Sequence, residues 1–299
     1  MARHNLALLL GTLEDKPIIA RSEEGEPVYA LATVIVVRAD RNAGDRRHGL
    51  VFAHIPIISR DAAIISEMDT WNENDIVEIK GPISYSAGKK KSTCPYCGAV
   101  QFRPGVNIYV NPIFAKKRGE LSDKDECNVF LKDNREVSNQ IYCFGNLCTD
   151  PKKYTIARNQ LVTVQYQIAL TRKFTIRTDP PERKTDFPWV KSYSDNALED
   201  KERLMVGSSV FIDGCLQSRN IQRHATCEEC DKEYTWSDRT LEIVPFETEY
   251  IYRIKTDGEV DKDRQKFYDQ KEKDIFTGAD DTITEDDIKR GFDLEDLKD

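Results

Sequence analysis

The sequence lacks the features that mark membrane proteins and most enzymes. No apolar run approaches the ~20 residues that a membrane-spanning helix needs. No phosphate-binding loop, nucleophile motif or cluster of carboxylates occurs, and the four histidines are scattered along the chain. These absences argue against a membrane protein and against an enzyme.

An export signal is also missing, because Met1–His4 lead directly into a strand-like segment. The chain has eight cysteines, and four of them form two CxxC pairs. In a chain without an export signal, such pairs favour reduced thiols that bind metal over disulfides. We therefore expect a cytoplasmic protein.

A basic overall charge is absent too, and the acidic charge is unevenly placed. The formal net charge is −8, yet residues 255–299 hold sixteen Asp or Glu against nine Lys or Arg, a net of −7. The other 254 residues therefore sum to −1. A neutral folded part leaves basic residues free to gather on one face, which permits nucleic-acid binding without indicating it.

What the sequence does contain is an internal repeat with a period of 134 residues, in which HNLALLLGTL at 4–13 is answered by SNQIYCFGNL at 138–147. The matched positions are Pro17 with Pro151, Val28 with Val162, Arg38 with Arg172 and, after a slip of one residue, Gly81 with Gly214 and Cys94/Cys97 with Cys227/Cys230. A period of this size is a whole domain, so we expect two similar domains.

Each repeat predicts five strands, with one helix between the third and the fourth. In the first repeat the expected strands are 5–13, 28–38, 50–57, 75–83 and 107–114, and the helix runs from a cap at 59–61 to 68. In the second they are 140–147, 161–170, 188–192, 209–217 and 241–246, with a helix at 195–204 capped by Ser194 or Asp195. This order is typical of an OB-fold barrel, although other small β-barrels or sandwiches share it.

Four motifs occur in order in the second repeat: GNLCTDP at 145–151, IALTR at 168–172, DFPWV at 186–190 and VGSSVFIDGCLQSR at 206–219. Together they resemble the bacterial single-stranded DNA-binding protein (SSB) family. A diluted version in the first repeat consists of Gly11, Leu13, Arg38 and the segment 79–83. The resemblance covers residues 3–117 and 138–252, and it leaves out the CxxC loops and the acidic tail.

The resemblance implies an all-β chain of two tandem OB-fold barrels with short helices. The expected parts are OB-fold 1 at 1–120, a connector at 121–137, OB-fold 2 at 138–254 and a largely disordered tail at 255–299. It also implies that single-stranded DNA binds along a barrel face, with bases stacked on aromatic rings and phosphates met by Lys and Arg.

The second repeat supplies most of the candidate contacts. Its stacking candidates are Trp189, Phe187, Phe174, Tyr166 and Tyr234 or Trp236. Its basic candidates are Arg172, Lys173, Arg177, Lys191, Arg219 and Arg223. The first repeat has no tryptophan in its third strand, so we expect it to contribute mainly charge, through Arg38, Arg41, Arg46 and Arg47, with Phe52 as its one aromatic.

The cysteine pairs Cys94/Cys97 and Cys227/Cys230 fall in equivalent loops between the fourth and fifth strands. CxxC followed by a turn residue is typical of a zinc knuckle, but a structural site needs four ligands and neither repeat has a second pair. One hypothesis is that both knuckles share one zinc. The alternatives are separate sites, for instance with His224, a site made between two chains, and a redox dithiol.

The remaining cysteines do not share the knuckle spacing. Cys143, Cys148 and Cys215 are expected to be buried apolar groups, and Cys127 in the connector is expected to bind nothing.

The polar, acidic tail is expected to lack structure, apart from one short helix beginning near Thr284. SSB proteins resemble this chain in having an acidic tail, which recruits replication and repair proteins and ends in Pro-Phe. The tail of this chain ends in DLEDLKD, without that Pro-Phe, which puts docking on the same partners in doubt. A purely solubilising tail is the alternative.

The leading hypothesis is a non-enzymatic protein that binds and protects single-stranded DNA in replication, recombination or transfer of a mobile element. The alternative is an RNA-binding or protein-assembly module. Because SSB proteins usually assemble four barrels, analogy suggests a homodimer of this two-barrel chain.

Overall fold

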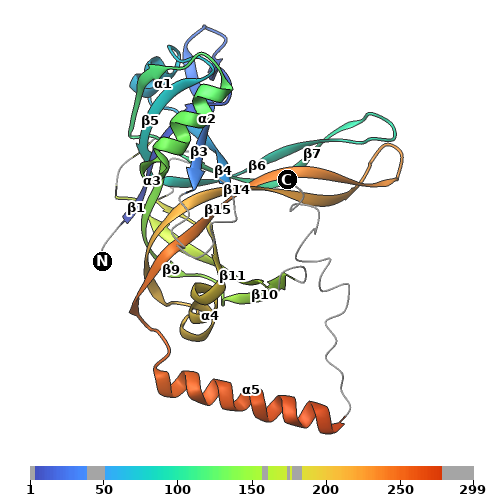
Figure 1. Cartoon of the computed structure of the whole chain (residues 1–299). Helices are drawn as coiled ribbons and strands as arrows, with labels where there is room; N and C mark the ends of the chain where they lie inside the picture. Colours follow the sequence, from blue (N-terminus) through green and yellow to red (C-terminus); the bar gives the residue numbers. More distant parts are fainter. Residues whose placement is uncertain (1–3, 39–50, 157–160, 174–175, 177–183, 278–299) are drawn as a thin grey trace.

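The computed structural model describes residues 4–38, 51–156, 161–173, 176 and 184–277, which form two β-barrels, a pair of long hairpins and five helices (Figure 1). The elements of the first repeat are β1 (His4–Leu13), β2 (Ile18–Arg21), β3 (Pro27–Arg38), β4 (Val51–Ser59), α1 (Ala62–Met68), β5 (Asp75–Gly81), β6 (Ile83–Thr93), β7 (Val100–Val110) and β8 (Phe114–Glu120). Those of the connector and second repeat are α2 (Lys124–Asp133), α3 (Arg135–Ser138), β9 (Asn139–Leu147), β10 (Lys152–Ile156), β11 (Leu161–Thr171), β12 (Thr185–Asp186), β13 (Trp189–Tyr193), α4 (Ser194–Arg203), β14 (Ser209–Thr226), β15 (Glu233–Tyr252) and α5 (Asp257–Thr277).

Both repeats close into five-stranded barrels of the same topology. In the second repeat the closed cycle runs β9, β11, β13, β15, β14 and back to β9. In the first repeat β5–β6 and β7–β8 act as the fourth and fifth strands, each interrupted near a proline. The third and fifth strands pair in parallel in both copies, Ile57 with Val110 and Val190 with Ile243. The predicted all-β class and order of elements are confirmed.

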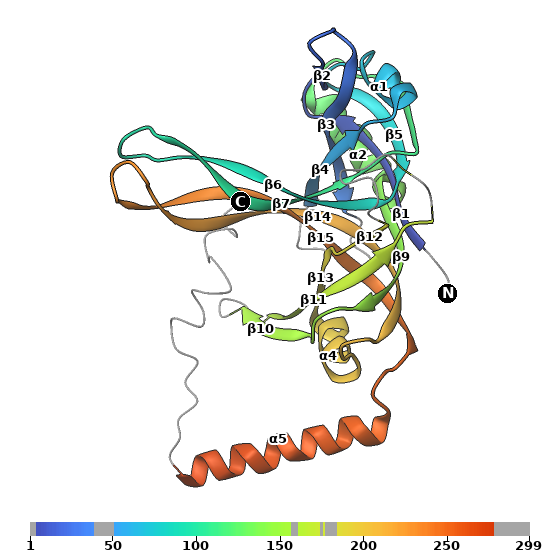
Figure 2. The same ribbon diagram turned by 180° about the vertical axis from the view of Figure 1, so that it is seen from behind.

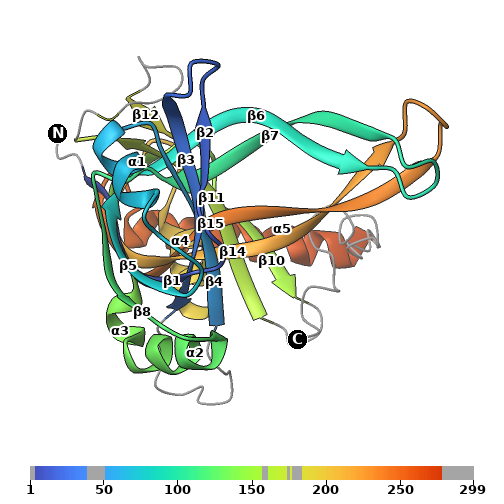
Figure 3. The ribbon, with the colours of Figure 1, turned by 90° about the horizontal axis from the view of Figure 1, so that it is seen from above.

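The fourth and fifth strands are much longer than predicted. The predicted fourth strands end at 83 and 217, and the predicted fifth strands begin at 107 and 241. In the structure both pairs of strands extend as hairpins to the cysteine pairs at 94 and 227. Both hairpins project from the barrels and lie side by side (Figures 1 and 3). Their polar outer segments bury no barrel core, so the hydrophobic pattern that marks the other strands is absent from them.

The two barrels are joined through their first strands. β1 pairs antiparallel with β9, from His4 opposite Phe144 to Leu9 opposite Asn139, so one sheet continues through both repeats (Figure 2). The buried apolar residues of the two barrels form one continuous core. An antiparallel pair of equivalent strands relates the two copies by a pseudo-twofold axis.

A buried asparagine in each copy ties the first strand of its own barrel to the fourth strand. Asn5 accepts from the backbone N–H of Ile83 and donates to its carbonyl, at 2.8 Å in both cases. Asn139 makes the same two bonds with Leu216, at 2.9 and 2.8 Å. Both amides are buried, and a buried backbone group that loses such a partner costs roughly 1–3 kcal/mol.

The helix predicted between the third and fourth strands is present in both repeats, as α1 and α4, but one of its two predicted caps is wrong. Asp61 accepts hydrogen bonds from the amides of Ala63 and Ile64 at the start of α1, as expected. The predicted cap of α4 is wrong, because the helix begins at Ser194 and Tyr193 precedes it without a side-chain cap bond. Within the described residues, no helix is long and apolar enough to cross a membrane.

The segment after the second barrel differs from the expected disorder. Residues 257–277 form α5, which is fastened to α4 by ion pairs from Arg264 to Glu202 and from Arg203 to Asp257. Alternating acidic and basic residues stabilise such a polar helix without an apolar face. Residues 278–299, with the short helix expected near Thr284, lie outside the described residues.

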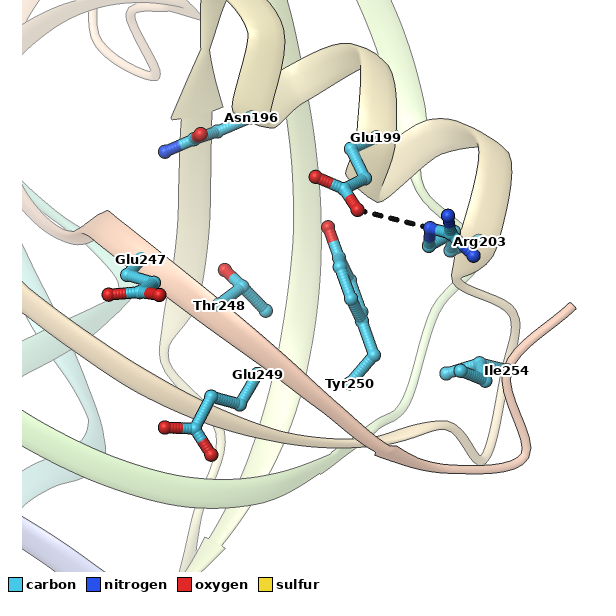
Figure 4. A pocket seen from close by; sticks show the side chains of 8 residues that line it. All are labelled: Asn196, Glu199, Arg203, Glu247, Thr248, Glu249, Tyr250 and Ile254. Atoms are coloured by element: carbon cyan, nitrogen blue, oxygen red, sulfur yellow. Dashed lines mark hydrogen bonds and ion pairs between the residues drawn. The ribbon is translucent and has the colours of Figure 1, made fainter.

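The buried face of α4 carries a carboxyl group, that of Asp200. Asp200 accepts from the hydroxyls of Tyr250 at 2.9 Å and Tyr166 at 3.2 Å. Tyr250 also lines a surface pocket between α4 and β15, of about 610 Å³, in which Glu199, Glu247 and Glu249 are its acidic neighbours (Figure 4). Burial raises the pKa of Asp200 to about 6, although the tyrosine hydroxyls oppose that shift.

The raised pKa of Asp200 predicts stability that falls as pH rises. The folded protein holds this proton more tightly than the unfolded chain, whose Asp pKa is 3.8. The free energy of unfolding should therefore drop by about 3 kcal/mol between pH ~4 and pH ~6. Urea titrations across this range test it. Asp200→Asn should remove this component of the slope, whereas the control Glu24→Gln, in an exposed turn of the first repeat, should keep it. An unchanged slope in Asp200→Asn contradicts the assignment.

Candidate metal centre and nucleic-acid interface

The four knuckle cysteines come together at the tips of the two hairpins. The Sγ atoms of Cys94 and Cys230 are 3.8 Å apart, and those of Cys97 and Cys227 are 3.5 Å apart. All four sulfurs lie within 4.8 Å of one another. A tetrahedral ion at about 2.3 Å from each thiolate places the sulfurs about 3.8 Å apart. Four cysteines from two repeats of one chain can therefore hold one metal ion.

Each knuckle has the same backbone turn. Cys94 accepts at its carbonyl from the amide of Gly98, and Cys227 accepts in the same way from Asp231, both at 3.0 Å. Gly98 and Asp231 have positive φ angles of 76° and 55°, which the turn requires. Hydrogen bonds from the backbone amides of Tyr96 and Cys97 lower the pKa of Cys94 to about 7, outweighing the opposing effect of its burial.

Hydrogen bonds around the sulfurs connect the two repeats. The amide of Gln101 donates to Sγ of Cys227 at 3.5 Å, and the Tyr234 hydroxyl shares a 2.8 Å hydrogen bond with Ser92. Trp236 packs against this small cluster. No histidine of the described residues joins the cysteine group, and His224 is exposed.

The two hairpins are also held together by charge. Asp238 is 3.0 Å from Nζ of Lys90 and 2.8 Å from Nε of Arg223. Lys90 and Arg223 occupy equivalent positions in the two repeats, 133 residues apart. The buried Asp238 of the second repeat thus pairs with two equivalent basic residues, one from each repeat.

Two aromatic rings of the second barrel are exposed on the strand where the sequence placed them. Trp189, on β13, is 36% exposed, and Phe187, just before it, is 37% exposed. The ring of Tyr85, from the first repeat, meets Phe187 edge-on with centroids 6.5 Å apart. The amide of Gln167 donates to the Phe187 carbonyl at 2.8 Å, which fixes the backbone beneath the rings.

Basic groups of both repeats lie on neighbouring strands. Arg38 donates to Gln217 at 2.8 Å, so a first-repeat arginine reaches the second barrel. Arg219 pairs with Glu242 at 2.9 Å, and Glu242 lies opposite Trp189 in the parallel register. Lys173 is exposed and Phe52 is half-buried.

Several predicted contact residues are not on the surface. Arg172 is buried and bound to Asp186 at 2.5 Å, so its guanidinium is committed to an internal ion pair. Lys191 is also buried, and burial together with nearby Arg219 lowers its pKa to about 8. Tyr166 and Tyr234 are buried, Tyr166 in the barrel core and Tyr234 in the small cysteine cluster, where Trp236 is half-buried beside it.

The remaining candidates are five residues of predicted loops and Arg223. Phe174, Arg177, Arg41, Arg46 and Arg47 lie outside the described residues. Arg223 is at the hairpin, paired with Asp238 and away from β13.

Sequence reasoning missed Tyr85 and Gln217. Their roles come from contacts between repeats, Tyr85 with Phe187 and Gln217 with Arg38, so no motif within one repeat marks them. The same holds for Asp186, which binds both Arg172 and the amide of Tyr85 at 2.8 Å.

Comparisons with known proteins agree with this architecture. Residues 138–236 match the model of the Single-strand binding protein family. The wild-type single-stranded DNA binding protein from Thermus aquaticus is 17% identical, with a TM-score of 0.51, over 84% of this chain and 95% of that chain. A deletion variant of the same protein gives 17% identity and a TM-score of 0.55, over 86% of this chain and 99% of that chain.

A search of curated proteins gives no match. The resemblance read from the motifs is confirmed in the second repeat, which contains the matched segment. Residues 138–236 of this chain thus match the single-strand binding protein family, and the compared part of the chain, up to 86% of it, shares the fold of the Thermus aquaticus protein.

Proposed function

We propose that the chain binds single-stranded DNA without sequence preference. The observation that carries the proposal is the pair of exposed rings, Trp189 and Phe187, on a barrel segment that matches the family. Every base offers a π-face, so stacking on such rings binds single strands whatever their sequence, at about 1–3 kcal/mol per base.

Basic groups around the rings would meet the phosphates. Lys173 and Arg219 of the second repeat and Arg38 of the first repeat are the described candidates, and Phe52 extends the face into the first barrel. The pairing of Arg219 with Glu242 keeps one cation beside Trp189 without adding net charge to the unbound surface. The acidic pocket at Glu199, Glu247 and Glu249 would repel phosphate and is left out of the interface.

Within the cell, the proposed role is to protect exposed single strands during replication, recombination or mobile-element transfer. The chain would act by occupancy and not by catalysis. Residues 1–120 and 138–254 are proposed as the two binding barrels, with 121–137 as their connector. The acidic residues from 255 onward would recruit partner proteins, because like charge keeps them away from bound DNA.

Replacing the exposed tryptophan tests the DNA-binding proposal. Trp189→Ala should weaken binding to oligo-dT by about 5- to 150-fold, because one stacked base is lost. Fluorescence anisotropy at two salt concentrations measures the affinity. Tyr252→Ala removes a ring that is 70% exposed at the far end of β15 and should bind like wild type.

The same titration with oligo-rU separates DNA binding from the RNA-binding alternative. Wild-type protein that fails to bind oligo-dT contradicts the proposed function.

We also propose that the four cysteines hold one structural zinc ion. All-sulfur tetrahedral sites are typical of zinc, and the knuckle turns and sulfur spacing fit such an ion. The ion would join the hairpin tips, beyond the hydrogen bonds and the ion pair that already connect the two hairpins. The ion would supply no chemistry beyond a cross-link between the repeats.

Removal of the metal should loosen the hairpins and leave the barrels intact. A strong chelator should raise amide hydrogen exchange at residues 88–106 and 221–239 by about tenfold or more, while β1 and β9 stay protected. Cys230→Ser should produce the same change, and a chelator should then add nothing. Cys148→Ser, at an exposed cysteine outside the group, is the matched control. Unchanged exchange in the hairpins contradicts a structural zinc.

The chain is further proposed to form a homodimer through the outer face of its central sheet. Half-buried apolar side chains alternate along β1 and β9 on the side away from the core: Leu6, Leu8, Leu10, Tyr142 and Phe144. Phe211 of β14 stacks on Tyr142, with centroids 6.5 Å apart. A face that already has pseudo-twofold symmetry is suited to self-association in a closed pair.

A charge placed on this face should separate the chains. Leu8→Glu should convert a dimer to a monomer in sedimentation equilibrium, because burying an unpaired carboxylate is unfavourable. Ile18→Glu, at a residue that is 63% exposed on β2, should remain dimeric. A wild-type protein that is monomeric at all concentrations contradicts this proposal.

A further inference from the structure

A recess lies where the first barrel meets the base of the hairpins. Its volume is about 270 Å³, and residues of β3, β4, β6, β7 and β15 line it. Leu31, Pro56, Ile58 and Leu241 contribute apolar walls, and His54, Lys90 and Arg239 contribute basic groups. We call it the slot. Both repeats build it, since β15 belongs to the second.

The slot occupies the position of the stacking rings in the other repeat. The parallel pairs Ile57–Val110 and Val190–Ile243 align the two third strands with an offset of 133 residues. At this offset His54 corresponds to Phe187 and Pro56 to Trp189. Where the second barrel presents a raised aromatic platform, the first barrel has a recess with an apolar wall.

The size and lining of the slot suit one nucleobase. A base that leaves its stack is usually held between apolar or aromatic side chains, with polar groups along its edge. Asn107 and Thr240 are uncharged polar residues on the slot wall. A volume of about 270 Å³ can hold one base but not several nucleotides.

The carboxylate of Glu14 lies beside two of the basic groups that line the slot. Oε1 of Glu14 is 3.0 Å from Nδ1 of His54, and Oε2 of Glu14 is 3.6 Å from Nη1 of Arg239. The Nδ1 atom of His54 is buried and, among the described residues, has no hydrogen-bond partner of good geometry. An anion that brought better geometry would compete with Glu14 for both groups.

From these observations we propose that the slot takes one unstacked base of single-stranded DNA, whose phosphate displaces Glu14 from His54 and Arg239. The first barrel would then bind by insertion where the second binds by stacking. Glu14 would act as an internal competitor that weakens the first barrel. This inference rests on the proposed function and specifies how the first repeat takes part in it.

Two variants test the slot in opposite directions. Leu31→Trp fills the recess and should weaken binding to oligo-dT by about 5- to 150-fold, the value of one base contact. Glu14→Gln removes the competing charge and should tighten binding by about 3- to 10-fold, with a salt dependence steeper by about one phosphate contact. Val129→Trp on exposed α2 and Glu24→Gln in an exposed turn are the matched controls. Circular dichroism confirms the fold of each variant.

A set of oligo-dT strands no longer than the binding site, each with one abasic position, locates the base, because the protein cannot shift away from that position. Wild-type protein should lose affinity at a position where Leu31→Trp shows no further loss. If wild type does not bind oligo-dT, the proposed function fails. If wild type and Trp189→Ala behave as proposed, while Leu31→Trp and Glu14→Gln both bind like their controls, the slot alone is wrong.

Discussion

The pairing of β1 with β9 is the constraint on which the rest of the structure depends. It joins equivalent strands antiparallel, so every other pair of equivalent elements must follow the same pseudo-twofold axis. Within each barrel, Asn5 or Asn139 ties the paired strand to the fourth strand, because its side chain satisfies both backbone groups of one residue there. A slip of one residue in the pairing would turn the buried side chains of both strands outward.

The hairpins and both candidate binding surfaces follow from that junction. Because the barrels are related by the axis, their fourth-to-fifth-strand hairpins leave side by side and bring Cys94 and Cys97 to Cys227 and Cys230. The same geometry carries Arg38 to Gln217, Tyr85 to Phe187 and Arg239 to Glu14. Residues of one repeat thus complete the surfaces of the other, which makes the two barrels one binding unit.

Much of the fold was predictable because each barrel strand buries one face. The apolar run of β1, the β-branched residues of β3 and Asp61 at the start of α1 predicted elements close to those observed. The hairpins were not predictable to their ends, since residues such as Lys89 and Lys91 cover no core. Helix α5 was missed for a similar reason: charge pairs along and between helices stabilise it, and it has no apolar periodicity.

The candidate site shows a comparable division. Trp189 and Phe187 were predictable from the motif at 186–190 and are exposed. Arg172 stood at an equally marked motif position, but Asp186 binds it inside the barrel, a contact that strand order alone does not reveal. The repeat suggested that the four cysteines meet, because it placed both pairs in equivalent loops. Their actual positions depend on the pairing of β1 with β9, which the sequence does not reveal.

The measurement that tests the central claim most directly is the metal content and sulfur coordination of the purified chain. X-ray absorption at the zinc edge, combined with elemental analysis, should find about one zinc per chain with four sulfur ligands. A mixture of a Cys94→Ser/Cys97→Ser chain with a Cys227→Ser/Cys230→Ser chain should not restore that site, because the four ligands belong to one chain. Two zinc ions per chain, fewer than four sulfurs per ion, or recovery of the site in the mixture would contradict the account.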